Sequence, residues 1–219
     1  MVTTDNKSQT KTERDQQRRE HILDAAQHHV VELGFHRTSM AMIAESSGLS
    51  VGQIYRYFEN KEAIIAALVE RMTNQRLQWM ELEKGWLKPV EWNESSMAPA
   101  RIADADRALL LEIQAEAARN PAIAEISYQA HLTLQAKAVS LLRKAFPEAD
   151  DDYLKLIVEL RATLIQGMML RRYDARDMDQ GKMTRFCMEL LLSLLNDPLD
   201  TPSLTEPQNI FPASRVSRL

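Results

Sequence analysis

The side chains with the clearest chemical potential lie close together, between residues 38 and 61. They are hydroxyls, phenols, an amide and cations, which suit hydrogen bonding to nucleic acid. An amide or a guanidinium can form paired hydrogen bonds with a base edge, whereas hydroxyls and ammonium groups bind phosphate oxygens. The residues expected to contact DNA are Thr38, Ser39, Ser50, Val51, Gly52, Gln53, Tyr55, Arg56, Tyr57 and Lys61.

Some central residues of this set suit contacts with DNA bases, and others suit contacts with the DNA phosphates. Gln53 and Arg56 are suited to reading base edges, and Tyr55 and Tyr57 can donate hydrogen bonds to phosphates. Because Gly52 has no side chain, the duplex can approach the protein backbone closely there.

Two short helices must position these residues. Helical spacing and capping hydroxyls predict helices over about residues 40–46, after Ser39, and 51–57, after Ser50, with Gly48 in the turn between them. This is the plan of a helix-turn-helix, whose second helix enters a major groove about 12 Å wide. Trihelical units also pack for structural reasons alone, so geometry leaves that alternative open.

Longer helices brace the short pair. One is expected over about residues 18–33 and ends at Gly34, and another runs from its N-cap Asn60 to about residue 84. Lys61 adds a charge beside the free amides of that second helix, which makes a phosphate site.

Residues 34–62, GFHRTSMAMIAESSGLSVGQIYRYFENKE, resemble the signature of the tetracycline-repressor (TetR/AcrR) family. The likeness includes a glycine-aromatic step, an Ile-Ala pair, Gly-hydrophobic-Ser, Tyr-x-x-Phe and a lysine that opens the connecting helix. The departures are Ser47, where alanine is usual, and Leu49, where valine is commoner. The resemblance covers about residues 18–65. It implies a homodimeric repressor that binds a palindromic double-stranded DNA operator and is released by an unknown small-molecule effector.

Overall charge does not by itself favour a nucleic-acid partner. The formal net charge is −4, and residues 1–76 hold ten Lys/Arg and ten Asp/Glu. We expect residues 1–17, which carry a basic run diluted by acids, to form a flexible arm along the DNA backbone. The neutral head keeps open an alternative, an all-α interaction or small-molecule carrier module whose head no longer reads DNA.

Helical periodicity continues through the rest of the chain. Four further helices are expected over about residues 100–119, 121–146, 151–173 and 182–195. The fold class is therefore all-α, with about nine helices and an N-terminal helix-turn-helix domain joined to a larger helical bundle. The expected divisions are a DNA-binding domain at 18–65, an effector-binding and dimerisation domain at 66–196, and a proline-spaced tail at 197–219.

The last two helices are apolar on more faces than one packing surface needs. Their residues form an intramolecular core or pair with a second copy, as the resemblance implies. Two-fold symmetry is needed to place two reading helices about 34 Å apart on a palindrome, so we favour the dimer. Its expected residues are Leu154, Ile157, Val158, Arg161, Leu164, Ile165, Phe186, Cys187, Leu190, Leu191 and Leu194.

An effector site is implied by the resemblance, not by spacing. Tyr128, His131 and Gln135 share one helical face, carboxylates suit a cationic ligand, and methionines suit an adaptable cavity. The plainer alternatives are solvent exposure, core packing and a tryptophan cover over the bundle end. The expected effector residues are Met72, Trp79, Glu112, Glu116, Tyr128, His131, Gln135, Met168 and Met169.

Enzymatic motifs are not found in the sequence. No GxSxG, HExxH or P-loop is present, and Cys187 lies in a leucine-rich stripe typical of an inert buried thiol. His21, Asp24 and His28 share a helical face that we expect to be solvated. We expect no catalytic residue, metal or cofactor. No apolar stretch reaches the ~18 residues of a membrane span, and the polar first 20 residues lead us to expect no secretory signal, so the expected location is cytoplasmic.

Overall fold

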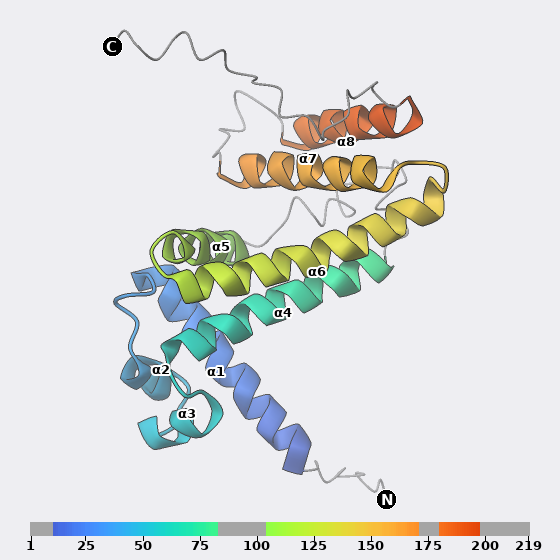
Figure 1. Cartoon of the computed structure of the whole chain (residues 1–219). Coiled ribbons are helices and arrows are strands. Elements are labelled where there is room, and N and C mark those ends of the chain that lie inside the picture. Colours follow the sequence, from blue (N-terminus) through green and yellow to red (C-terminus); the bar gives the residue numbers. More distant parts are fainter. Residues whose placement is uncertain (1–10, 83–103, 171–179, 198–219) are drawn as a thin grey trace, which may run out of the picture.

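The computed structural model describes residues 11–82, 104–170 and 180–197. These residues form eight α-helices and no strand, which confirms the all-α prediction and comes close to the expected nine. The helices are α1 (Lys11–Leu33), α2 (Met40–Ser46), α3 (Val51–Tyr57), α4 (Lys61–Leu82), α5 (Asp104–Ala117), α6 (Pro121–Ala145), α7 (Asp151–Leu170) and α8 (Gln180–Asn196), as Figure 1 shows. The tryptophan-containing loop, the tail and the side chains of Met168 and Met169 lie outside the described part of the chain.

The first helix begins earlier than its apolar stripe predicted. Residues 11–17, expected in a flexible arm, belong to α1. This stretch is rich in lysine, glutamate, arginine and glutamine, which are good helix formers, and Gln16 Nε2 donates to Glu20 Oε1 at 2.8 Å one turn later. An apolar stripe marks only the packed part of a helix, so it missed the exposed first turns.

The two short helices and their caps follow the prediction. Ser39 Oγ accepts the Met42 amide at the start of α2. Gly34 and Gly48 end the preceding helices with φ of 82° and 65°, a conformation that favours glycine. Asn60 Oδ1 accepts the Ala63 amide at 2.8 Å and so caps α4.

Two apolar cores stabilise the described chain. The first core joins α1 to α5 and the start of α6, and includes the fully buried Ile22, Ile54, Leu68 and Leu109. The second core joins the later part of α6 to α7 and α8 around Leu154, with the end of α4 packed against it. The division between the cores therefore crosses α4 and α6, and does not coincide with the expected domain boundary after residue 65.

The two longest connections between the cores are α4 and α6, which lie side by side and run in the same direction (Figure 1). Near their far ends Lys137 Nζ donates to Glu81 Oε1 at 2.7 Å, and this hydrogen bond lowers the pKa of the Glu81 carboxyl. The short helices lie at one end of the molecule, and α7 and α8 lie at the other.

Two general features of the described helices bear on function. None is both long and apolar enough to cross a bilayer. Within the same ranges, no three His, Cys, Asp or Glu side chains come together as potential metal ligands.

Candidate nucleic-acid interface

Helix α3 packs by one face and presents the other to solvent. Ile54 and Phe58 are buried in the first core and hold the helix from its inner side. On the outer side Val51 is 40% exposed, Tyr55 is 53% exposed, and Arg56 is exposed as well. An exposed helix anchored in this way can enter a groove without rearranging its own core.

A capping box closes the first turn of α3. Ser50 Oγ accepts the Gln53 amide at 3.3 Å, and Gln53 Oε1 accepts from the Ser50 amide at 2.8 Å. The Gln53 side-chain oxygen is therefore occupied, and the side-chain nitrogen is the group it can offer to a base acceptor. Beyond its chain neighbours and the backbone of its own helix, no described residue has an atom within 4 Å of the place where a Cβ on Gly52 would be, so the backbone there is accessible.

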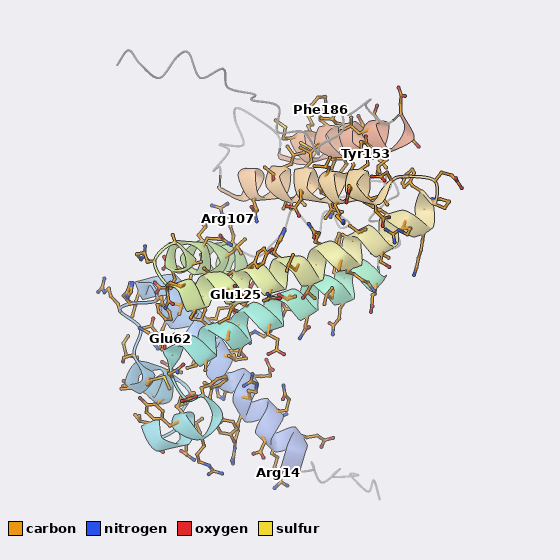
Figure 2. The ribbon with its side chains drawn as sticks, in the orientation of Figure 1. Arg14, Glu62, Arg107, Glu125, Tyr153 and Phe186 are labelled. Carbon is orange, nitrogen blue, oxygen red and sulfur yellow. The ribbon has the colours of Figure 1, made fainter. Side chains whose placement is uncertain are left out.

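The end of α3 is tied to the first turns of α1. Tyr57 Oη donates to Asp15 Oδ1 at 3.2 Å, so its hydroxyl is directed toward α1. The Arg19 guanidinium lies 4.7 Å from the centre of the Phe58 ring, in cation–π geometry. Arg14, at the free end of α1, is thereby held at the same end of the molecule as α3 (Figure 2).

The two hydroxyls before α2 differ in accessibility. Thr38, predicted to contact DNA, is only 2% exposed, and its Oγ1 donates to the Gly34 carbonyl at 2.9 Å. Burial removes this side chain from any DNA contact, because the hydroxyl is used to close the loop. Ser39 caps α2. Because its side chain is also exposed, it is accessible to a phosphate.

Lys61, predicted to contact a phosphate, contacts the loop between α1 and α2 in the structure. Its Nζ donates to the carbonyls of Phe35 at 2.7 Å and Thr38 at 3.1 Å, and lies 4.2 Å from the centre of the Phe35 ring. The carbonyls of a loop lack helical partners, so the ammonium group satisfies them. Lys61 thus holds the loop between α1 and α2 and is turned toward the protein.

Comparison with known proteins gives a consistent assignment. Residues 22–68 match the model of the bacterial regulatory proteins of the tetR family. The transcriptional regulator UidR of Escherichia coli K12 is 33% identical over 128 residues, which are 58% of this chain and 65% of UidR. The solved structure of Salmonella enterica GusR is 28% identical, with a TM-score of 0.69 over 85% of this chain and 98% of GusR. Residues 22–68 therefore form a head of the tetR family.

The match to UidR spans slightly less than two thirds of that protein. The fold likeness extends further: the solved SmeT–triclosan complex covers 88% of this chain and 99% of SmeT, with 22% identity and a TM-score of 0.65. The tetR-family model itself covers only the head, so the assignment of effector and dimer residues depends on the geometry of the bundle.

Two carboxylates expected in the effector site face the tetR-family head. Glu116 is 3% exposed, and its Oε2 lies 3.1 Å from His36 Nε2 and 3.3 Å from Arg119 NH2. Glu112 Oε2 lies 3.3 Å from the place where a Cβ on Gly34 would be. Both residues therefore stand at the junction between α5 and the loop before α2.

The polar face of α6 is directed partly toward α7. His131 Nε2 and Gln135 Nε2 lie 2.9 Å and 2.6 Å from Glu159 Oε1, so both residues tie the two helices together. Tyr128, one turn earlier, is 56% exposed and lies open to solvent. Met72 packs against the first core, in agreement with the core-packing alternative.

Several polar groups are buried inside the bundle. Trp79 Nε1 on α4 and Ser127 Oγ on α6 are buried and make no hydrogen bond with the described residues. Burial also lowers the pKa of the Arg161 guanidinium on α7 to about 10. Sequence patterns indicated Trp79 and Arg161 but gave no reason to single out Ser127.

The predicted dimer residues divide into an inner and an outer group. The inner residues are buried within one chain, as the intramolecular alternative requires: Leu154, Ile157, Val158, Cys187 and Leu191. Leu164 and Leu194 pack partly against the second core, and Arg161 and Ile165 are half-buried.

The outer group remains exposed. Phe186 and Leu190 on α8 are 64% and 45% exposed, and Phe186 projects from the outer end of the molecule in Figure 2. Leu156 and Leu160 on α7, 39% and 38% exposed, were missed by the sequence analysis. Their i, i+4 spacing beside the main apolar stripe was the available signal.

Proposed function

We propose that this chain is a ligand-responsive transcriptional repressor that binds a palindromic operator as a homodimer. The observation that carries the proposal is the exposed face of α3, where Val51, Tyr55 and Arg56 stand on a helix anchored by the first core. Arg56 and the side-chain nitrogen of Gln53 are assigned to base edges. Ser39 and Tyr55 are assigned to phosphates.

The dimer is assigned to the exposed apolar residues of α7 and α8. Large apolar side chains that stay exposed together mark an interaction surface. Phe186, Leu190 and Leu156 belong to two helices at the end of the molecule opposite α3. Pairing there leaves both reading helices free, and a two-fold axis gives the symmetry that a palindrome requires.

The effector is assigned to the interior of the bundle, within residues 66–196, and DNA reading to residues 18–65. Buried polar groups usually have hydrogen-bond partners, so Trp79 Nε1 and Ser127 Oγ suit an incoming ligand. The fold relative SmeT binds triclosan, which supports a small-molecule effector here. These two ranges divide the chain by function. The boundary between them differs from the boundary between the two cores, because the first core includes residues of α5 and α6.

The decisive experiment is selection of binding sites from randomised duplexes at about 150 mM salt, where non-specific phosphate contacts are suppressed. We expect enrichment of a palindrome. Arg56→Ala should weaken binding to it by about 1–3 kcal/mol at an unchanged fold. The matched control is Lys144→Ala, which removes one exposed positive charge from α6, far from α3, and should leave operator affinity unchanged.

The alternative is an interaction or carrier module whose head no longer reads DNA. It predicts that the folded protein enriches no sequence and that Arg56→Ala changes nothing measurable. Once an operator is known, effectors can be found by screening for compounds that both release the DNA and change tryptophan fluorescence. A tight-binding compound that left operator affinity intact would separate ligand binding from regulation.

A further inference from the structure

The loop between α1 and α2 is held by a carboxylate from the bundle. Glu116, near the C-terminal end of α5, is 3% exposed and lies 3.1 Å from Nε2 of His36, whose side chain is 67% exposed. A buried carboxylate is costly unless it is paired and hydrogen-bonded. Arg119 NH2 lies 3.3 Å from the same carboxylate, and the His36 contact ties that carboxylate to the loop, which gives the orientation of the loop relative to α5 an energetic preference.

The same loop is held from its other side by α4. Lys61 donates to the Phe35 and Thr38 carbonyls, while the Gly34 backbone lies close against Glu112 of α5. The positive φ of Gly34 and this close approach both disfavour a larger residue. Residues 34–38, which lead directly into α2, are thus clamped between the start of α4 and the end of α5.

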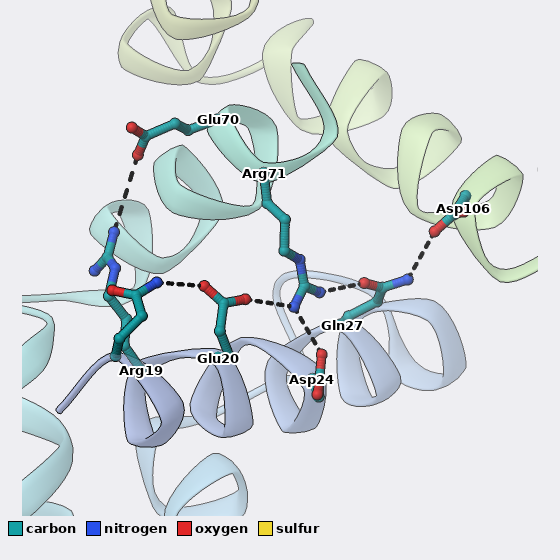
Figure 3. Close-up of polar contacts among 8 residues, drawn as sticks. Arg19, Glu20, Asp24, Gln27, Glu70, Arg71 and Asp106 are labelled. Carbon is teal, nitrogen blue, oxygen red and sulfur yellow. Dashed lines mark hydrogen bonds and ion pairs between the residues drawn. The ribbon is translucent and has the colours of Figure 1, made fainter. Parts of the chain in front are cut away.

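A second polar connection lies at the opposite end of α5. Gln27 on α1 donates to Asp106 Oδ1 at 3.1 Å, and Arg71 on α4 contacts Gln27 and bonds Asp24 at 2.7 Å (Figure 3). Burial lowers the pKa of the Arg76 guanidinium, and the negative charge of Asp106 partly offsets this lowering. Between these two connections the buried Leu109 and Ile113 of α5 belong to the first core, so α5 is fastened to the head along its length.

We propose that Glu116 is a positioning residue which, through His36, fixes the angle of the reading head relative to the bundle and thereby the half-site spacing that the dimer accepts. The proposal rests on the proposed function. In a two-fold dimer both heads are carried at a distance from the axis, so a small rotation at the junction changes the separation of the two α3 helices. The half-site spacing that the dimer accepts then depends on α5, whereas the base sequence that it prefers depends on α3.

The test uses the full-length protein and the duplex obtained by selection, with one base pair added or removed at its centre. The measured quantity is the ratio of dissociation constants for the altered and original spacing. His36→Ala removes an exposed side chain, and Glu116→Met removes the buried charge at similar size. Each variant should lower the spacing ratio by about tenfold while still binding the original duplex, because it removes the hydrogen bond that ties the loop to α5.

Controls separate positioning from a general loss of stability. Glu125→Gln, which removes an exposed carboxylate of α6 outside the Glu116–His36 contact, should keep the wild-type spacing ratio. The double variant should lose little more than either single variant, since both remove one interaction. An unchanged ratio in His36→Ala that binds the original duplex overturns the positioning role alone. Failure of the wild-type protein to enrich any palindrome overturns the proposed function and this inference together.

Discussion

The first and second cores differ in how completely they close. Around the head, Ile22, Ile54 and Leu68 are fully buried, and the polar residues Thr38 and Glu116 are buried with partners. Around α7 and α8 the inner leucines are equally buried, but Phe186 and Leu190 remain largely exposed. The first core is complete within one chain, whereas the second has an outer apolar surface that a second copy would cover.

This difference suggests that the first core contributes mainly to the stability of the single chain, and that the exposed surface beside the second core contributes to association. Under the proposed function, the end with α3 reads DNA from a core that is closed within one chain, while the opposite end pairs with a second copy. Since α4 and α6 belong to both cores, they are the elements through which a change at one end can reach the other. Variants in each region should therefore have distinct effects on stability, assembly and DNA binding.

The largest expected effect is a cavity in the first core. Leu68→Ala, at a position that is 0% exposed, should lower the free energy of unfolding by about 2–5 kcal/mol, because it removes buried methyl groups and leaves a void. Urea denaturation followed by circular dichroism measures the change in stability. Leu190→Ala, at an exposed position, should cost far less when measured at concentrations where the protein is monomeric.

A charge on the exposed apolar surface of α8 should prevent dimerisation and leave the fold intact. Phe186→Glu places a carboxylate where we expect an apolar interface, so dimerisation should weaken by at least about 3 kcal/mol. Sedimentation velocity should show monomers, with helical content retained. An exposed control, Lys155→Glu, lies on the polar side of α7 and should sediment as the wild type does. Dimers of Phe186→Glu at micromolar concentration would contradict the assigned surface.

Removal of the Lys61 ammonium should have an intermediate effect confined to the head. Lys61→Met leaves the Phe35 and Thr38 carbonyls without their donor, which should cost about 1–3 kcal/mol. Hydrogen exchange measured by mass spectrometry should speed up in residues 34–46 and stay unchanged in α7. If Lys61 instead contacted phosphate, the variant would lose DNA affinity without any change in exchange.

The smallest expected effect concerns the free end of α1. Arg14→Gln should lower the slope of log affinity against log salt by about 0.9 for each phosphate that the arginine neutralises, and leave the preferred sequence unchanged. Fluorescence anisotropy of the selected duplex over a salt series measures the slope. Lys144→Gln provides the charge-matched control on α6. A changed sequence preference would mean that Arg14 reads bases.

The sequence predicted short-range features of the head well. The caps of α2 and α3 and the glycine-containing turns depend on residues three or four positions apart, so their patterns can be recognised locally. The role of Lys61 could not be predicted in this way. Its side chain is turned toward the loop before α2, where it contacts the carbonyl and the ring of Phe35, 26 positions earlier in the chain.

Interactions between distant segments explain the remaining differences. Glu112 and Glu116 stand one turn apart on α5, a spacing typical of solvated carboxylates or of a site for a cation. Their neighbours Gly34 and His36 lie far earlier in the chain, beyond the reach of any local pattern. In α7 the buried and exposed aliphatic residues share one apolar composition, and only three-dimensional packing separates the inner Ile157 from the outer Leu160.

The membership of α5 in the first core has a consequence for recombination between relatives. A head excised after residue 65 would be separated from Leu68, Leu109 and Ile113, and would leave a broad apolar surface open to water. Heads grafted at that point would pack against the α4 and α5 residues of another relative, and the mismatch should lower the stability of the chimeras. Grafts that transfer α5 and the beginning of α6 together with the head preserve the whole packing unit. The unit that packs as one body thus consists of two segments that are separated in the sequence, the head and α5 with the start of α6.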